Sequence, residues 1–234
     1  MPGERGSTKT SHSGSICSLR IGLKGPTSVP STMLFIRTMN SLVSKRRRPT
    51  CISELEPKRI GLLHQLVPGI PLIGVLWTRG IRAVARHLQE IEDAAQTIGQ
   101  RLFIAQAGND AELNAAFVSL AQQRLGALLV AASTYLDTRR SQIIAFAAEN
   151  RLPAIYQFRE YVVSGGLISY GPRITDSYQL AGNYAARILQ GTNPAELPVQ
   201  QPTRFELVIN RKTAKALGLT VPNSLQSLAD ELIE

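Results

Sequence analysis

A regular alternation of short apolar segments with amphipathic helical segments is the feature that most restricts how this chain can fold. Four apolar runs follow one another at 72–77, 102–106, 127–132 and 153–156. Between them the apolar residues recur at helical spacing, as from 81 to 99. Strand–helix–strand units of this kind favour right-handed crossovers between parallel strands. The sequence therefore predicts an α/β fold with a doubly wound parallel sheet.

Further elements flank this repeat. A helix is expected just before the first strand, ended by Pro68-Gly69, and another is expected from 138 to 150. Asn109 or Asp110 is expected to cap the helix that follows the second strand. After Pro172 we expect a helix over 176–190, a strand over 205–209 and two terminal helices, over 212–217 and 224–233.

The positive charge of the chain is concentrated at its beginning. Residues 1–50 hold nine of the 26 basic residues and one of the 17 acidic residues, and they show no sustained periodicity. Residues 1–52 are therefore predicted to be a disordered basic leader. The run at 45–48 could be a patch for nucleic acid or anionic lipid, but a solvated charge run is favoured. The remaining chain is nearly neutral, so we expect no nucleic-acid partner.

Several function classes lack the residues they would need. The two cysteines, Cys17 and Cys51, lie in or at the end of the leader, and no metal-ligand spacing or nucleophile motif occurs. We therefore predict no enzyme activity, no catalytic residue, no cofactor and no metal. No apolar run is long enough to cross a bilayer, and no stretch near the start has the apolar core of a signal peptide.

Candidate binding residues lie where strands end, because ligands of open α/β sheets bind beyond the carboxyl ends of the strands. The segment 152–172 holds three of the six tyrosines around a Gly165-Gly166 pair, which is typical of a small-molecule site. A hairpin whose tyrosines pack at an edge is the alternative for this segment. The predicted ligand-binding set is Trp77, Thr78, Ser133, Thr134, Tyr156, Arg159, Ser169 and Tyr170.

Three segments carry a resemblance to a known family. The runs VPGIPLIGVLW, LPAIYQFREYVVSGGLISYGP and LPVQQPTRFELVINRKTAKALGLTVPNSL resemble ABC-transporter substrate-binding proteins related to tryptophan- and tyrosine-binding proteins. The similarity extends from about Ser53 to the C-terminus. It implies the type I periplasmic-binding-protein fold, a periplasmic location, and a two-lobed clamp that delivers a small, possibly amino-acid-like solute to an ABC permease and its ATPase without catalysis.

The resemblance also implies a domain organisation. Family members begin with an export signal and a complete first lobe, neither of which residues 1–52 match. We expect 53–168 to form one complete α/β lobe, 169–203 to be a crossover segment and helix that normally belong to the first lobe, and 204–234 to add a C-terminal strand and helices. The other lobe would then be largely missing.

The resemblance places the candidate residues as well. It puts Tyr156 and Arg159 near the cleft, Ser169 and Tyr170 at the crossover between lobes, and Trp77-Thr78 at the end of the first strand. For the rings, packing at a hinge is the alternative. Arg159 could pair with a ligand carboxylate and the tyrosines could stack on a ligand ring, so the ligand's identity stays open.

Two other functions remain possible at this stage. An effector-binding domain of a transcriptional regulator has the same architecture, but it would need a helix-turn-helix, and the basic leader shows no such helix pair. The chain could also be a truncated remnant that binds nothing.

Overall fold

The computed structural model describes residues 55–78, 83–198, 200 and 202–234, so the predicted basic leader lies outside the described residues. Within them, seven strands form one sheet in the order β2-β1-β3-β4-β5-β6-β7. The strands are β1 (Leu72–Trp77), β2 (Arg101–Gln106), β3 (Ala127–Val130), β4 (Ala154–Tyr156), β5 (Ile168–Pro172), β6 (Phe205–Asn210) and β7 (Glu231–Ile233). Every neighbouring pair is parallel except β5 and β6.

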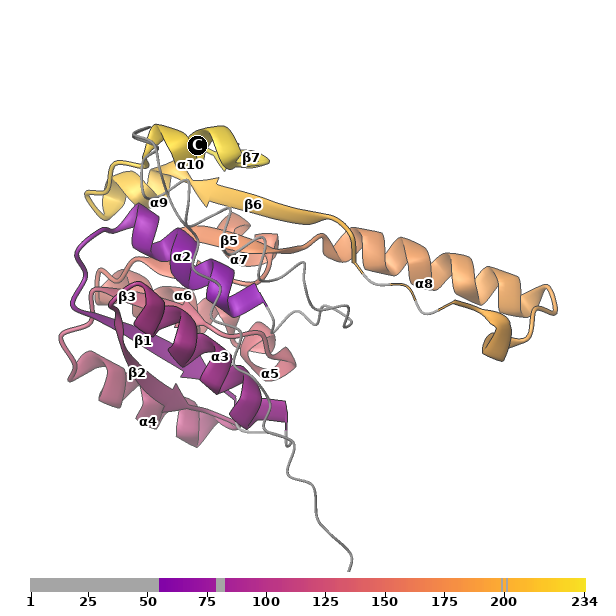
Figure 1. Cartoon of the computed structure of the whole chain (residues 1–234), viewed down its shortest axis with the longest axis horizontal. Coiled ribbons are helices and arrows are strands. Elements are labelled where there is room, and N and C mark those ends of the chain that lie inside the picture. Colours follow the sequence, from indigo (N-terminus) through magenta and orange to yellow (C-terminus); the bar gives the residue numbers. More distant parts are fainter. Residues whose placement is uncertain (1–54, 79–82, 199, 201) are drawn as a thin grey trace, which may run out of the picture.

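Helices cover both faces of this sheet (Figure 1). One face packs against α2 (Glu56–Leu66), α3 (Ala83–Thr97), α9 (Arg211–Ala216) and α10 (Asn223–Leu228). The other packs against α4 (Asp110–Ala121), α5 (Thr134–Thr138), α6 (Arg140–Glu149) and α7 (Arg159–Val163). Successive strand side chains point to opposite faces, so Val75 joins the first core cluster and Leu76 the second. The predicted doubly wound α/β sheet is confirmed.

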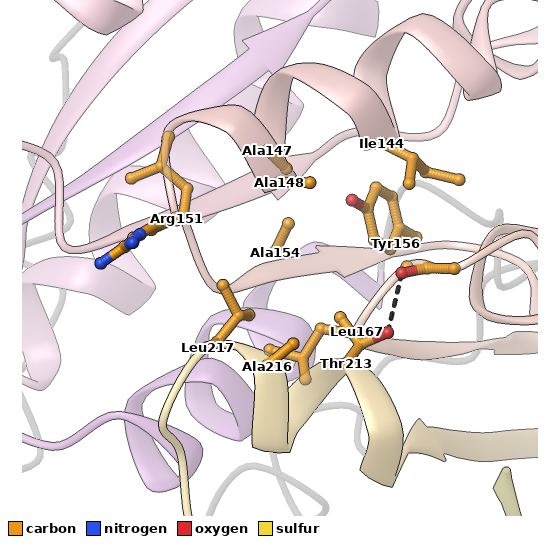
Figure 2. A pocket seen from close by; sticks show the side chains of 13 residues that line it. Ile144, Ala147, Ala148, Arg151, Ala154, Tyr156, Leu167, Thr213, Ala216 and Leu217 are labelled. Carbon is orange, nitrogen blue, oxygen red and sulfur yellow. Dashed lines mark hydrogen bonds between the residues drawn. The ribbon is translucent and has the colours of Figure 1, made fainter. Parts of the chain in front are cut away.

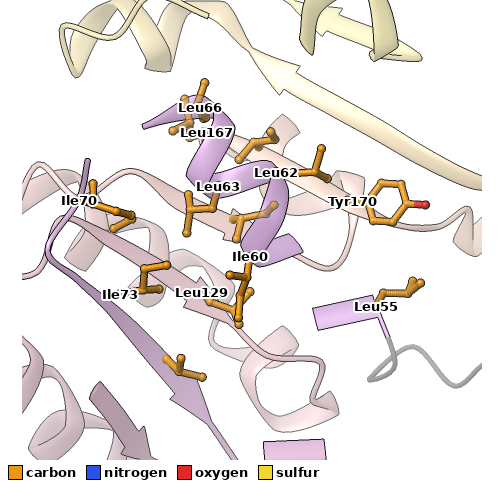
Figure 3. Packing of buried hydrophobic residues seen from close by; sticks show 14 of the residues in the cluster. Leu55, Ile60, Leu62, Leu63, Leu66, Ile70, Ile73, Leu129, Leu167 and Tyr170 are labelled. Carbon is orange, nitrogen blue, oxygen red and sulfur yellow. The ribbon is translucent and has the colours of Figure 1, made fainter. Parts of the chain in front are cut away.

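The first cluster anchors α2 across the middle of the sheet. Ile60 and Leu63 of this helix are fully buried and lie over Ile73 of β1 and Leu129 of β3 (Figure 3). Burying an aliphatic side chain of this size stabilises a fold by about 1.5–3 kcal/mol. This packing positions the start of α2, which carries charged residues, against the strands.

Side-chain caps explain where several helices begin. The Asn109 side chain accepts a hydrogen bond from the Glu112 amide at 2.9 Å, which confirms Asn109 as the cap of α4. Ser133 caps α5 in the same way, and Asn210 caps α9. The Ser133 cap starts a short helix before the predicted one, so the helix expected over 138–150 is preceded by α5 and begins as α6 at Arg140.

The structure excludes one alternative for local structure and shortens one expected helix. The hairpin alternative for 152–172 fails because β4 and β5 are parallel and α7 connects them. The helix expected over 224–233 is confirmed only as far as Leu228, where α10 ends and β7 follows. The Asp230 amide donates to the Leu207 carbonyl at 2.9 Å and the Asp230 carboxylate accepts from the Leu207 amide at 2.8 Å. These bonds attach the last residues to β6 as a strand.

One helix stands apart from the sheet. The segment after β5 forms α8 (Ile174–Leu189), continues through the short 3-10 helix η2 (Pro194–Glu196) and returns as β6. Figure 1 shows α8 extending away from the body, and none of its residues is buried. Tyr178 is 72% exposed and Leu189 is 88% exposed. Among the described residues, no helix combines the length and apolarity needed to cross a membrane.

Candidate functional site

The carboxyl ends of β1, β3 and β4 lie along one edge of the sheet, which we call the carboxyl edge. It consists of Thr78, Ala132 with Ser133, and the stretch 157–159. Polar side chains at this edge come from loops that the parallel strands bring together, as expected for the ligand crevice of such sheets.

Two of the predicted residues meet here. The Thr78 hydroxyl donates to the Ser133 hydroxyl oxygen at 2.7 Å, although the residues are 55 positions apart in the chain. The same Ser133 oxygen accepts from the Leu136 amide at 3.4 Å, because Ser133 caps α5. Both residues are partly exposed, and Thr134 beside them is exposed. The structure therefore brings the Thr78 and Ser133 hydroxyls together at the ends of β1 and β3, with Thr134 next in the chain.

A buried ion pair lies next to this edge. Glu56 and Arg59 are fully buried at the start of α2, with Arg59 Nη1 at 3.0 Å from Glu56 Oε1. The same Glu56 oxygen accepts from the Ala132 amide at 3.2 Å, and Arg59 Nε donates to the Tyr170 carbonyl at 2.7 Å. The pair thus connects α2 to the end of β3 and to the middle of β5.

Burial has the largest effect on the pKa values of Glu56 and Arg59. It raises the pKa of Glu56 to about 7, against the opposing attraction of Arg59 and the hydrogen bond from Ala132. Burial likewise lowers the pKa of Arg59, opposed by Glu56. Within the described residues, Glu56 Oε2 and Arg59 Nη2 have no hydrogen-bond partner.

A second polar group lies beneath the end of β4. Asp137 of α5 accepts hydrogen bonds from the Gln157 side-chain amide and from the Tyr161 hydroxyl, the latter at 3.1 Å. Burial raises the pKa of Asp137, and the two hydrogen bonds act in the opposite direction. Gln157 is fully buried, and its side-chain oxygen has no partner in the described part of the chain.

Exposed hydrogen bonds connect the loops at the rim of the carboxyl edge. Arg139 binds the Asp110 carboxylate through two hydrogen bonds of 2.8 Å, and the Tyr135 hydroxyl donates to it at 2.9 Å. These hydrogen bonds, from Arg139 first, lower the pKa of Asp110. The Arg139 guanidinium also lies 5.7 Å from the centre of the Tyr135 ring. The network joins the segments that follow β2 and β3.

The other predicted residues are placed differently. Trp77 is 5% exposed and packs in the first core cluster. Tyr156 is 1% exposed and stacks on Tyr161 in the second cluster, with ring centroids 4.6 Å apart. Arg159 makes a two-bond ion pair with Glu231 of β7, at 2.6 and 2.7 Å. The guanidinium proposed for a ligand carboxylate is therefore already engaged within the protein.

Ser169 and Tyr170 lie on β5, where the chain leaves for α8. Ser169 is buried, and its hydroxyl has no partner among the described residues. Tyr170 is 9% exposed. Its hydroxyl accepts from Lys58 Nζ, which also lies 4.2 Å from the ring centre. The centres of the Tyr170 and Phe205 rings are 6.2 Å apart. Tyr170 therefore packs against other side chains at the crossover.

Sequence reasoning missed four residues of this edge: Glu56, Arg59, Asp137 and Gln157. A Glu and an Arg three positions apart at the start of a helix usually form a solvated pair, and nothing local shows that α2 buries both. Gln157 directly follows a strand, and that position alone could have identified it. Among the described residues, no group of three or more His, Cys, Asp or Glu side chains could hold a metal ion.

Comparisons with known proteins show what the chain is similar to. The family model for ABC transporter substrate binding proteins matches residues 39–233. The chain is 25% identical over 162 residues to a curated tyrosine-binding protein from Clostridioides difficile (strain R20291), covering 69% of this chain and 47% of that protein. The chain thus spans about half the length of that curated relative.

Solved structures share the fold. A conserved domain protein from Vibrio cholerae has a TM-score of 0.68 at 23% identity, covering 76% of this chain and 60% of that one. A domain in complex with L-Trp from Streptococcus pneumonia has a TM-score of 0.68 at 21% identity, covering 76% and 62%. An open, ligand-free substrate-binding protein from Clostridium difficile has a TM-score of 0.53 at 20% identity, covering 75% and 59%. The predicted type I periplasmic-binding-protein-like fold is confirmed by these likenesses.

Proposed function

The chain belongs to the family of ABC transporter substrate-binding proteins, and from this we propose that it is the solute-binding component of an ABC importer. In this proposal it holds a small amino-acid-like ligand in a cleft between two lobes and delivers it to a permease, with an ATPase driving import. It acts outside the cytoplasmic membrane and catalyses no reaction.

The contact between the Thr78 and Ser133 hydroxyls is the observation that supports a ligand site at the carboxyl edge. Their 2.7 Å hydrogen bond holds the ends of β1 and β3 together and leaves both partly exposed at the carboxyl edge. A hydroxyl can both donate and accept, so this pair suits the carboxylate or ammonium of an amino acid. The nearby Tyr135 ring, braced by Arg139, offers a surface for an aromatic side chain.

The arrangement of α8 supports a clamp of two lobes. In this proposal residues 53–168 form one lobe, while 169–203 cross to the other and 204–234 return to the first. The support is that β5 and β6 lie side by side in the sheet, whereas the helix between them is entirely unburied. The relatives are also longer, since the chain covers only about 60% of the solved structures.

The ligand class rests on the relatives together with the chemistry of the edge. One relative is described as tyrosine-binding and one structure as a complex with L-Trp. We therefore expect an aromatic amino acid to bind here, weakly in this chain, because a wall from only one lobe buries less of the ligand than a closed cleft would.

Nuclear magnetic resonance titration suits such weak binding. We would add L-tyrosine, L-tryptophan and L-leucine in turn to the full chain and follow backbone amide shifts. The aromatic amino acids should shift the amides of Thr78, Ser133 and Tyr135, and L-leucine should shift them less. The Thr78→Val variant should weaken binding by about fivefold, since one neutral hydrogen bond is lost.

The matched control is Thr97→Val, which removes a hydroxyl that bonds the Asp93 carbonyl on α3. It should leave the affinity unchanged. Equal shifts with all three amino acids, or shifts confined to residues away from the carboxyl edge, would contradict the proposed function.

A further inference from the structure

A separate pocket lies among α6, β4, the segment before β5 and α9, and we call it the α6–α9 pocket (Figure 2). Its volume is about 160 Å³. Its lining is mainly apolar, with Ala147 from α6, Ala154 from β4, and Ala216 and Leu217 from the region of α9 among its members. None of the hydroxyl-bearing residues of the carboxyl edge contributes to it.

The pocket lies toward the opposite ends of the parallel strands. Ala154 is the first residue of β4, and Leu167 immediately precedes β5. Because β6 runs antiparallel to β5, α9 begins where β5 also begins. The α6–α9 pocket is therefore distinct from the proposed solute site.

The exposure of the lining residues shows which end is open. Ala148, Arg151 and Ala216 are exposed, so the mouth lies between α6 and α9. Tyr156 and Leu167 are 1% and 2% exposed, which makes them the deep end. A small molecule entering between the two helices would meet alanine methyl groups first and the Tyr156 ring last.

The Tyr156 hydroxyl has no hydrogen-bond partner in the part of the chain that the structure describes. The stacked Tyr161 hydroxyl, in contrast, donates to Asp137. Figure 2 shows the Tyr156 oxygen directed toward the side of the pocket where Ala148 lies. Burial raises the pKa of Tyr156, so the hydroxyl keeps its proton at neutral pH. The Tyr156 side chain is 1% exposed and lines the pocket, so its hydroxyl is available to a molecule bound there.

The ring that carries this hydroxyl is held in place. Tyr156 stacks on Tyr161 with an interplanar angle of 16°, and Gly166 lies so close that an added Cβ would be 2.7 Å from the Tyr156 ring. The Thr213 hydroxyl donates to the Gly165 carbonyl at 3.0 Å, which fixes the opposite wall (Figure 2). The Tyr156 hydroxyl therefore cannot turn away to find another partner without repacking.

We propose that the α6–α9 pocket binds a molecule of one aromatic ring that carries a single neutral polar substituent, which pairs with the Tyr156 hydroxyl. The volume matches one ring, because an engineered apolar cavity of about 150 Å³ binds benzene. The lining contains no carboxylate, so the ammonium of an amino acid would be buried unpaired in this pocket. A phenol satisfies both conditions, since its ring fills the pocket and its oxygen accepts from Tyr156.

Phenol and toluene are suitable probes because they differ by exchanging a hydroxyl for a methyl group of similar size. Both should shift the backbone amides of Gly165, Gly166 and Thr213 when added to the full chain. In the Tyr156→Phe variant phenol should bind about fivefold more weakly, the effect of one lost neutral hydrogen bond. Toluene should bind the variant as well as it binds the unaltered protein. The variant should fold normally without ligand, since the hydroxyl it removes makes no hydrogen bond to a described residue.

A blocking variant tests the location independently. Ala216→Phe adds a ring at the exposed mouth and should abolish the binding of both probes. Ala115→Phe places the same ring on the exposed surface of α4 and should leave binding unchanged. No shift at Gly165, Gly166 and Thr213, or equal weakening of phenol and toluene by Tyr156→Phe, would overturn the proposal. Shifts at Thr78 and Ser133 instead would place the probes in the proposed solute site and also overturn it.

Discussion

Replacing Glu56 by glutamine should make the protein more stable at neutral and mildly alkaline pH. Glu56 is fully buried, and its Oε1 accepts from both the Ala132 amide and Arg59. Its Oε2 has no partner among the described residues. A glutamine can keep both hydrogen bonds at Oε1 and place its amide nitrogen where Oε2 lies. The substitution therefore removes the ionisation of Glu56, and with it the attraction of the carboxylate to Arg59, while keeping both hydrogen bonds.

The magnitude follows from the pKa. Burial raises the pKa of Glu56 from 4.5 to about 7, which corresponds to about 3 kcal/mol, because one pKa unit is worth about 1.4 kcal/mol. The folded protein holds this proton more tightly than the unfolded chain does. The stability it contributes is fully present below about pH 4.5 and is lost as the pH rises through about 7.

The comparison with E56Q isolates this contribution from the other titrating groups. Below about pH 4.5 the protonated glutamate resembles glutamine, so the two proteins should have similar free energies of unfolding. By about pH 8 the unaltered protein should be less stable than E56Q by about 3 kcal/mol. Burial of the carboxylate then costs more than its attraction to Arg59 returns, as happens for many buried ion pairs.

Urea unfolding at a series of pH values measures this difference directly. E149Q, which removes a carboxylate from the exposed end of α6, is the matched control and should leave the pH dependence unchanged. A constant difference between E56Q and the unaltered protein across this pH range would refute the reasoning. So would an E56Q variant that is less stable at about pH 8, since the ion pair would then be net stabilising.

Three further predictions concern Gly171 and the Arg159–Glu231 ion pair. Gly171→Ala should destabilise by about 3 kcal/mol or more in urea unfolding, because the added Cβ would lie 1.8 Å from the Gln157 carbonyl oxygen and the backbone would have to move. Gly182→Ala on α8, where nothing lies within 4 Å, should instead be neutral or slightly stabilising, and similar losses in both would contradict the steric argument. A double-mutant cycle of Arg159→Ala and Glu231→Ala should give a coupling of about 0.5 kcal/mol, since both side chains are more than a third exposed. L-tyrosine affinity should not fall in Arg159→Ala, and a tenfold loss would return Arg159 to the solute site.

The parts of the fold that sequence reasoning predicted are those in which the pattern is local. The run 127–132 is apolar throughout because β3 is buried on both faces, and that burial can be read from six adjacent residues. The segment 224–233 carried no comparable pattern. Its end forms β7 because residues 231–233 pair with residues 208–210 of β6, which lie 23 positions earlier in the chain.

The candidate site was predictable in position but not in its contacts. Thr78 and Ser133 were expected at the carboxyl edge because both directly follow strands, and the structure brings them into contact. Tyr156 also ends a strand, yet its side chain turns into the layer beneath α6, where it borders the α6–α9 pocket together with Gly165 and Gly166. From the sequence alone, Arg159 was expected to be available to a ligand. In the structure its guanidinium is paired with Glu231.

The alternation of strands and helices in the first four units and the edge where the loops gather depend on neighbouring residues, so they could be predicted from the sequence. Which polar groups are paired, and which are buried without a partner, depends on how distant segments pack together. Arg59 bonds to Tyr170 across 111 positions of the chain, and no local pattern records such a contact. Its energy depends on how far the packing of α2 excludes water, which is a property of the assembled fold.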